Sequence, residues 1–424
     1  MVLILLASLA FAQQETRIDG VLEVLSVDSD SLCPDVPRGF VPGVMRTTAG
    51  LAVHRGDGSY AHVCPDRWGA EGDGPAASDP SGRELYMLAD GVVYRSTNSG
   101  CQVLQAEQPD GFVAHAVRYW RSAFWVLGRA AGGVGGALWR YDEGGASTVI
   151  TRWTDFTPDG FAPEGNDHLW VGGIAGQQVR RLRFLGGLGD DEPLDIPTGD
   201  LRDVEFIRPI AAFDGEAWIQ LRRRNQSWLW HARVLSGSAG TNIVFEEDPV
   251  RASALHGPIL QQGVWVMVRN LKLHSALRLS GEWRDTGFDA PWTCLTQVGD
   301  RGFACTLRTL YAFERFSEEG EPTLAEVFSW PQLGEPEPAC GAADACDASW
   351  SALADRLGRD ADAPVAVCPD GRTAASFADD GCACNGSAGA KMTVWMLLTG
   401  FFARFRRRRD VVAVAFRARG GHNS

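Results

Sequence analysis

The chain lacks the residue patterns of common catalytic and metal centres. Its eight histidines are scattered and form no metal-binding spacing. It has no Gly-x-Ser-x-Gly elbow, no P-loop and no EF-hand loop. We therefore predict no catalytic residue, no metal ligand and no cofactor. Two acidic segments, Asp159–Asp167 and Gly189–Glu192, are interpreted as solvated turns rather than as structural Ca²⁺ sites.

Basic residues are scarce outside the C-terminus. The whole chain carries 40 Lys+Arg against 53 Asp+Glu, a formal charge of -13. From Lys391 onward there are eight basic residues and one acidic residue, so the rest holds 32 against 52, or a charge of -20. An acidic body lacks the basic surface that binding to nucleic acid requires. Nucleic acid is therefore not expected as a partner.

The first residues predict a signal peptide over 1–12. Val2–Leu9 is apolar, and Ala10-Phe11-Ala12 fits the small-x-small cleavage rule, with the mature chain starting at Gln13. No Lys or Arg precedes the apolar run, which leaves a buried first strand as the alternative and places the expected true start upstream of Met1. Ten cysteines also favour export, because disulfides persist in oxidising compartments.

The body of the chain repeats short apolar-aromatic strands at nearly regular intervals. The steps between successive copies are 39, 45, 48, 47 and 39 residues. Most copies are followed by a second strand and a glycine-containing turn, and Leu51–His54 with Tyr60–Val63 fits as an earlier copy. The six repeated positions are Leu85-Tyr86, Phe124-Trp125, Leu169-Trp170, Ala217-Trp218, Val264-Trp265 and Phe303-Ala304.

This spacing predicts an all-β fold. A step of about 40–48 residues is the length of one four-stranded propeller blade. Blades laid end to end over residues 21–333 give a seven-bladed β-propeller. One small sheet cannot cover both of its faces, whereas radially stacked blades bury them on one another.

Six tryptophans fall at equivalent strand positions, and we interpret them as packing between blades rather than as platforms for sugar rings. They are Trp125, Trp139, Trp170, Trp218, Trp230 and Trp265.

The turn after Tyr94 has a more specific pattern. Residues 95–103 read RSTNSGCQV. They resemble the Asp-box of sialidase-like and sortilin-like propellers, because Ser96 and Gly100 match while Asn98 replaces the Asp. Such a box is a folded turn in which an Asx side chain binds nearby backbone and glycine adopts positive φ. The resemblance implies a propeller blade and no chemistry.

The cysteines suggest two pairings. Cys294 and Cys305 flank a Gly-Asp-Arg-Gly turn and are predicted to meet across a hairpin. Cys33 and Cys64 are predicted to tie the irregular entry of the first blade.

Composition changes after Trp330 and predicts a Cys-rich spacer over residues 334–380. Asp347 fits an N-cap for a helix over Ala348–Leu357, and Gly358 fits its stop. We expect this helix to belong to a small disulfide-stapled segment that leans on the propeller.

The C-terminus has three parts in a fixed order: Cys382-Ala-Cys384 among small residues, the apolar run Met392–Ala403, and the arginines of Arg404 and Arg406–Arg409. The run spans only ~18 Å as a helix, against ~30 Å of hydrocarbon. The arginines have no place in a core and would hold this end on the cytoplasmic side. We predict a single transmembrane segment over 391–405.

This order resembles the MYXO-CTERM C-terminal sorting tails, over residues 381–409. The resemblance implies anchoring of a precursor in the inner membrane, cleavage near Cys382 and Cys384 by a sortase-like intramembrane protease, and display on the cell surface or outer envelope. The extension over residues 410–424 departs from the family pattern. Removing the two tail cysteines from the ten leaves eight, enough for four disulfides.

Three functions fit these observations. The first is an exported, non-catalytic propeller that binds an unknown glycan or protein ligand at its axial face. The second is a secreted glycan-active hydrolase of sialidase-like type, which would need an arginine triad, a nucleophilic tyrosine and acidic partners at the axis. The third is a structural envelope protein held by its tail alone. Nothing in the sequence places the arginines, the tyrosine and the acidic residues of the second function together.

Overall fold

A computed structural model describes most of the chain before residue 374. The described residues are 21–28, 33, 36–37, 39–68, 74–142, 144–174, 178–184, 191–195, 204–223, 226–237, 240–245, 250–252, 255–278, 282–336, 343–358 and 364–373. The chain divides into two units, Met1–Gly381 and Cys382–Ser424, and the second lies wholly outside the described residues.

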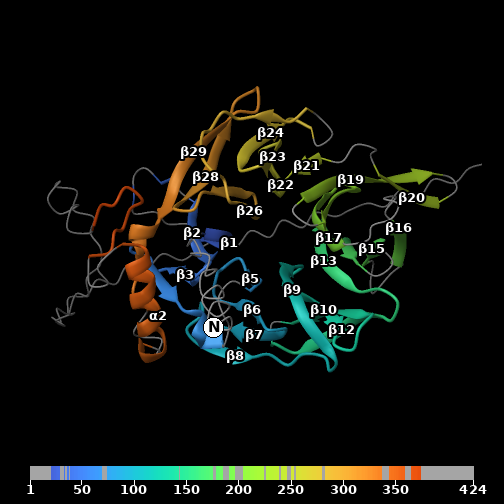
Figure 1. Cartoon of the computed structure of the whole chain (residues 1–424), viewed down its shortest axis with the longest axis horizontal. Coiled ribbons are helices and arrows are strands. Elements are labelled where there is room, and N and C mark those ends of the chain that lie inside the picture. Colours follow the sequence, from blue (N-terminus) through green and yellow to red (C-terminus); the bar gives the residue numbers. More distant parts are fainter. Residues whose placement is uncertain are drawn as a thin grey trace, which may run out of the picture. The chain divides into compact units, whose positions relative to one another are not determined.

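The first unit consists of seven antiparallel sheets, each formed by consecutive strands (Figure 1). The predicted all-β, seven-bladed propeller is therefore confirmed. Blades 1 to 4 contain β1(Val21–Asp28), β2(Val41–Thr47), β3(Gly50–His54) and β4(Tyr60–Val63); β5(Ala76–Ser78), β6(Leu85–Ala89), β7(Val92–Ser96) and β8(Val103–Gln105); β9(Phe112–Trp120), β10(Ala123–Ala130), β11(Gly136–Tyr141) and β12(Ser147–Trp153); and β13(Pro158–Glu164), β14(His168–Gly173), β15(Gln178–Arg183) and β16(Asp191–Asp195).

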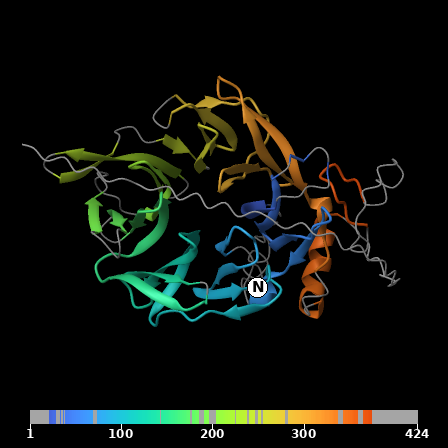
Figure 2. The ribbon, with the colours of Figure 1, turned by 180° about the vertical axis from the view of Figure 1, so that it is seen from behind.

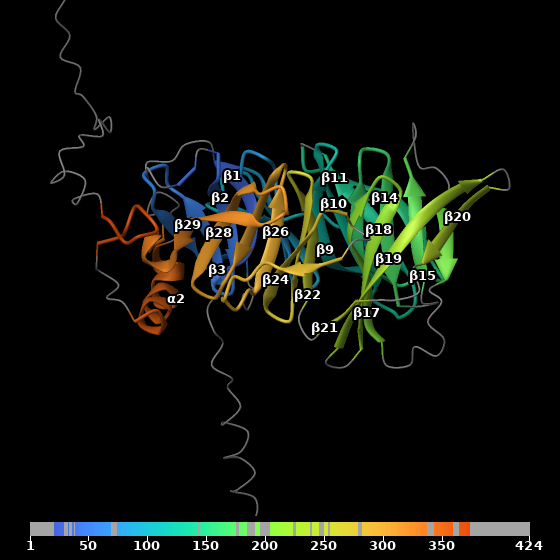
Figure 3. The same cartoon turned by 90° about the horizontal axis from the view of Figure 1, so that it is seen from above.

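Blades 5 to 7 follow the same plan, with one additional strand. They contain β17(Val204–Phe213), β18(Glu216–Arg223), β19(Gln226–Gly237), β20(Gly240–Phe245) and β21(Val250–Ala252); β22(Leu255–Gln261), β23(Val264–Arg269), β24(Lys272–Ala276) and β25(Arg284–Asp285); and β26(Cys294–Val298), β27(Arg301–Cys305), β28(Thr309–Phe316) and β29(Pro322–Ser329). The additional strand β21 pairs with β19. Figure 3 shows the β19–β20 hairpin extending beyond its neighbours.

The first strand of each blade lies innermost, and these seven strands form a closed ring of contacts. β1 contacts β5, β5 contacts β9, β9 contacts β13, β13 contacts β17, β17 contacts β22, β22 contacts β26, and β26 returns to β1. A closed ring leaves no inner sheet edge unprotected. It also turns one strand of every blade towards a common axis.

The hydrophobic core lies between the blades. Seven clusters of buried side chains occur, one at each blade-to-blade interface. Five of the six repeated tryptophans are buried, and Trp230 is partly buried against the cluster between blades 4 and 5. This burial supports the packing interpretation of the tryptophans. Trp170, for example, is fully buried and donates a 2.7 Å hydrogen bond to Glu164 Oε2.

The repeated positions seen in the sequence belong to the second strand of blades 2 to 7. Leu85-Tyr86 lies in β6, and Phe303-Ala304 lies in β27. The earlier copy was placed one strand too late, because Leu51–His54 falls in β3, the third strand of blade 1. The equivalent second strand is β2, whose sequence VPGVMRT has no aromatic residue to reveal it.

The segment after blade 7 returns to blade 1. A short strand, β30(Leu333–Gly334), pairs in parallel with β4, the outermost of the four consecutive strands of blade 1. The helix α2(Ala343–Arg356) follows and lies beside blade 1 (Figures 1 and 2). It buries Trp350 and Leu353 in the cluster shared by blades 1 and 7. The predicted helix is therefore present but begins five residues before Ala348, so Asp347 lies within it. The helix ends two residues before Gly358, the residue predicted to stop it, and Gly358 has a φ of 70°.

Two disulfides tie this returning segment to blade 1. Cys33 pairs with Cys368 and Cys64 pairs with Cys346, which corrects the predicted Cys33–Cys64 pairing. Both cysteines of blade 1 instead meet partners from the segment that closes the ring. The third disulfide, Cys294–Cys305, agrees with the prediction and joins directly opposed residues of β26 and β27.

Every cysteine of the described residues is disulfide-bonded, including Cys101. Such cysteine usage is typical of exported proteins. No described helix is long and apolar enough to cross a membrane. The signal-peptide positions Ala12 and Gln13, the tail cysteines Cys382 and Cys384, and the expected transmembrane segment over 391–405 all lie outside the described residues.

Candidate functional site

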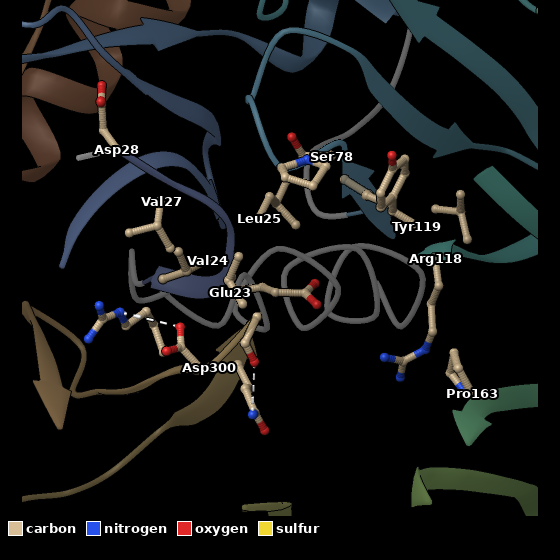
Figure 4. Close-up of a pocket in the computed structure, with 18 of the residues that line it drawn as sticks. Glu23, Val24, Leu25, Val27, Asp28, Ser78, Arg118, Tyr119, Pro163 and Asp300 are labelled. Carbon is tan, nitrogen blue, oxygen red and sulfur yellow. Dashed lines mark hydrogen bonds and ion pairs between the residues drawn. The ribbon is translucent and has the colours of Figure 1, made fainter. Parts of the chain in front are cut away.

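A channel lined by the innermost strands runs along the propeller axis. Its central cavity, of about 310 Å³, is bordered by residues from all seven blades. Its rim cavity, of about 510 Å³, is bordered by the far ends of β1, β5, β9 and β26, by the segments that follow β1, β5 and β26, and by Pro163 and Arg301. Glu23 and Arg118 border both cavities, and Figure 4 shows them entering the rim cavity from opposite sides. The two cavities are parts of one channel.

The central cavity has a strongly polar lining. The charged and polar side chains that border it come from the first or second strand of six blades: Glu23, Arg46, His115, Arg118, Asp159, Arg208, Gln220, His256 and Thr296. Pockets of this kind, of about 300–1,000 Å³ with convergent polar groups, are the usual location of small-molecule sites.

Two of these residues reach the axis because they occupy irregularities in the strand pairing. In β9, the register moves from Ala116 opposite Leu127 to Ala114 opposite Gly128, so that His115 is left without a partner residue. In β13, the register moves similarly past Asp159. A β-bulge of this kind redirects a side chain and is common beside functional sites.

The carboxylates of the central cavity already have cationic or main-chain partners. Glu23 accepts hydrogen bonds from Arg46 Nε at 3.3 Å and Arg46 Nη2 at 3.2 Å. Asp159 forms an ion pair with Arg129 and accepts the Ile207 amide at 2.8 Å. Both negative charges are therefore neutralised by the protein itself.

The guanidinium of Arg118 differs from the other charges of the cavity. It projects into the channel and makes no hydrogen bond or ion pair with any described residue. Its side chain is exposed to the solvent of the channel, and partial desolvation by the surrounding protein lowers its pKa despite the attraction of Glu23.

Arg208 lies close enough to Arg118 for the two charges to repel. Burial lowers the pKa of Arg208, the carboxylate of Asp159 opposes this, and the positive charge of Arg118 lowers the pKa further. Arg208 Nε donates to Gln220 Oε1 at 3.1 Å, and its guanidinium stacks over Phe206 at 4.3 Å. Its terminal amino groups have no partner among the described residues.

The histidines of the channel are held neutral. Burial and the nearby Arg129 lower the pKa of His115 to about 4, and burial followed by Arg208 lowers the pKa of His256. The main-chain groups of Val113 and Asp159 raise the pKa of His115 and so offset part of this lowering. Neither group makes a hydrogen bond of ordinary geometry with the ring. Each neutral ring keeps one N–H donor at neutral pH.

The turn predicted from the Asp-box resemblance is folded as its residue types require. The Ser96 hydroxyl accepts the Gly100 amide at 2.9 Å, and Asn98 Oδ1 accepts the Gln102 amide at 2.7 Å. Gly100 has φ 90°, which suits glycine. The turn joins β7 to β8 and borders neither cavity of the channel.

The acidic segment Asp159–Asp167 is only partly the solvated turn that we expected. Its end is an exposed turn, but Asp159 and Glu164 are buried in or at the end of β13 and bind arginines. Among the described residues, no group of three or more His, Cys, Asp or Glu side chains is placed to hold a metal ion.

The channel residues were missed at the sequence level. The available signal was a charged residue within an otherwise apolar first strand of a repeat, as with Glu23, Arg118 and Arg208. That signal is weak, because the outer strands of the same blades also carry charges.

Comparison with known proteins finds only distant resemblances. No protein-family model matches the chain, and no curated protein matches it. Solved structures resemble it at low identity. YCF48 from Cyanidioschyzon merolae is 12% identical, with 73% of this chain and 95% of that chain covered at a TM-score of 0.45.

Two further structures have different activities. A catalytically inactive virginiamycin B lyase from Staphylococcus aureus, with quinupristin, is 13% identical over 60% of this chain and 83% of that chain, with a TM-score of 0.41. The GH74 enzyme of Niastella koreensis is 12% identical over 70% and 56%, with a TM-score of 0.32. None of these functions transfers to this chain at such a level of likeness.

Proposed function

We propose that this protein is an exported β-propeller that binds a ligand in its axial channel and catalyses no reaction there. The observation that carries the proposal is Arg118, whose charge projects into the channel without a hydrogen bond or ion pair to any described residue. A guanidinium without a partner inside the protein keeps its N–H donors free, and a bound ligand would supply the acceptors. Disulfide use by all seven described cysteines supports export.

Binding assays on the purified protein test this proposal. We expect a glycan array and a small-molecule library to yield at least one ligand whose affinity falls tenfold or more in Arg118→Ala. Arg308→Ala is the matched control, because Arg308 is exposed in a turn of blade 7 away from the cavities. Ligands that bind both variants equally well would contradict a site in the channel.

A hydrolase of sialidase-like type is the second candidate, and Tyr119 is the observation that favours it. Tyr119 borders the rim cavity beside Arg118, with Glu23 and Asp28 also on the lining. By contrast, burial raises the pKa of Tyr141 to about 12, which makes its phenol a poor nucleophile. Hydrolysis of fluorogenic glycosides that disappears in Tyr119→Phe would establish this candidate and refute the non-catalytic one.

The sorting tail completes the proposal. We infer that the precursor is anchored through residues 391–405 and processed near Cys382 and Cys384 by a sortase-like intramembrane protease. The basis is the order of cysteines, apolar run and arginines in the sequence. Mass spectrometry of surface-exposed protein should find a C-terminus near these cysteines. Surface material that retains Arg406–Arg409 would show that no processing occurs.

A further inference from the structure

The central cavity contains more positive than negative charge, although the chain as a whole is acidic. Three arginines border it, Arg46, Arg118 and Arg208, together with the carboxylates of Glu23 and Asp159. The chain carries a formal charge of -13, so a cationic cavity does not follow from composition. Its charge results from where the fold places a few side chains.

The protein pairs some of these charges directly and leaves two cations without a hydrogen bond or ion pair to a carboxylate. Arg46 is matched by Glu23, and Arg129 from β10 matches Asp159. Arg118 and Arg208 remain, and each has guanidinium nitrogens that donate to no described residue. The two positive charges repel each other, and an anion between them would attract both.

We propose that the channel binds a small organic acid through its carboxylate, held between Arg118 and Arg208. This inference rests on the proposed function and names the ligand class of the same site. A guanidinium offers a planar fork of N–H donors that matches a carboxylate. The neutral His115 ring borders the same cavity and offers a further N–H donor.

The rim cavity narrows the ligand class further. Its carboxylates Asp28 and Asp300 contact His54 and Arg301, so the rim adds no cation without a partner for a second negative group of a ligand. It also offers partly exposed apolar surface from Val27, Tyr119 and Val298. A ligand with one carboxylate in the central cavity and an apolar or aromatic body towards the rim fits both parts of the channel.

The test compares probes that share one carbon skeleton and differ in charge. For each acid, the alcohol and the amine of the same skeleton are measured by calorimetry, with 4-phenylbutyrate, 4-phenylbutanol and 4-phenylbutylamine as the first set. We expect the acid to bind at least tenfold more tightly than the alcohol, and the amine not to bind. Equal affinity of acid and alcohol, or no binding by any acid of the panel, would overturn the inference.

Variants locate the effect at the proposed residues. Arg118→Gln should weaken binding of the acid tenfold or more and leave the weak binding of the alcohol nearly unchanged, whereas Arg308→Gln should change neither. Arg118→Gln should also leave the thermal midpoint of the ligand-free protein nearly unchanged, because Arg118 makes no hydrogen bond or ion pair with any described residue. An unaltered affinity for the acid in Arg118→Gln would refute the site.

The result also separates this inference from the proposed function. If an uncharged glycan binds in the channel and loses affinity in Arg118→Ala, ligand binding stands and the carboxylate inference fails. If neither acids nor any library member binds, both fail.

Discussion

At the scale of single residues, the fold holds His115 in its neutral form on a bulge of β9. Its pKa in the folded protein is about 4, below the unfolded value of 6.5. The unfolded chain therefore binds a proton between pH 6.5 and pH 4 that the folded chain does not. Stability from this residue is fully present above pH 6.5 and is lost as the pH falls towards 4.

We expect His115→Gln to flatten this pH dependence. Between pH 7 and pH 5 the wild type should lose up to ~2 kcal/mol of unfolding free energy through His115, and the variant should lose correspondingly less. Urea unfolding at the two pH values measures the difference. Other groups near the ring, Arg129, Asp159 and His256, remain in the variant. His168→Gln is the control, since its lowered pKa belongs to a less buried ring. Identical slopes for wild type and His115→Gln would contradict the assignment.

At the scale of strands and blades, the sequence predicted the strands that recur in every blade and missed the bulges that occur in single strands. The second strand of each of blades 2 to 7 was found, because an apolar strand buried on both faces must recur in every blade. Bulges were missed, because one extra residue such as His115 or Asp159 leaves the repeat length nearly unchanged. These bulges place His115 and Asp159 in the channel, so the fold was predictable and this part of the site was not.

Disulfide pairing shows the same division between local and distant contacts. Cys294 and Cys305 are 11 residues apart across one turn, and their strand pairing was readable from the sequence. Cys33 meets Cys368 at a separation of 335 residues, and that contact exists only once the ring has closed. Hairpin geometry constrains near neighbours only, so the partner of Cys33 could not be identified before the fold was known.

At the scale of the whole molecule, two disulfides fasten the ring where its ends meet. Cys33–Cys368 and Cys64–Cys346 join blade 1 to the segment after blade 7, and β30 adds main-chain hydrogen bonds to β4. With one of these disulfides intact, the other closes a loop of 53 residues through it, made of the 31 steps from Cys33 to Cys64 and the 22 steps from Cys346 to Cys368. The hairpin disulfide spans only 11 residues. A longer loop restricts the unfolded chain more.

We therefore expect removal of Cys33–Cys368 to destabilise the protein more than removal of Cys294–Cys305. On the chain-entropy model the difference is about 1 kcal/mol, within a cost of ~2–5 kcal/mol for a native disulfide. The variants are Cys33→Ala with Cys368→Ala, and Cys294→Ala with Cys305→Ala as the control. All four side chains are buried, so the cavities left by alanine are comparable. Guanidinium unfolding of the two proteins measures the difference. An equal or larger loss in the hairpin variant would mean that closure of the ring does not depend on the disulfide at its seam.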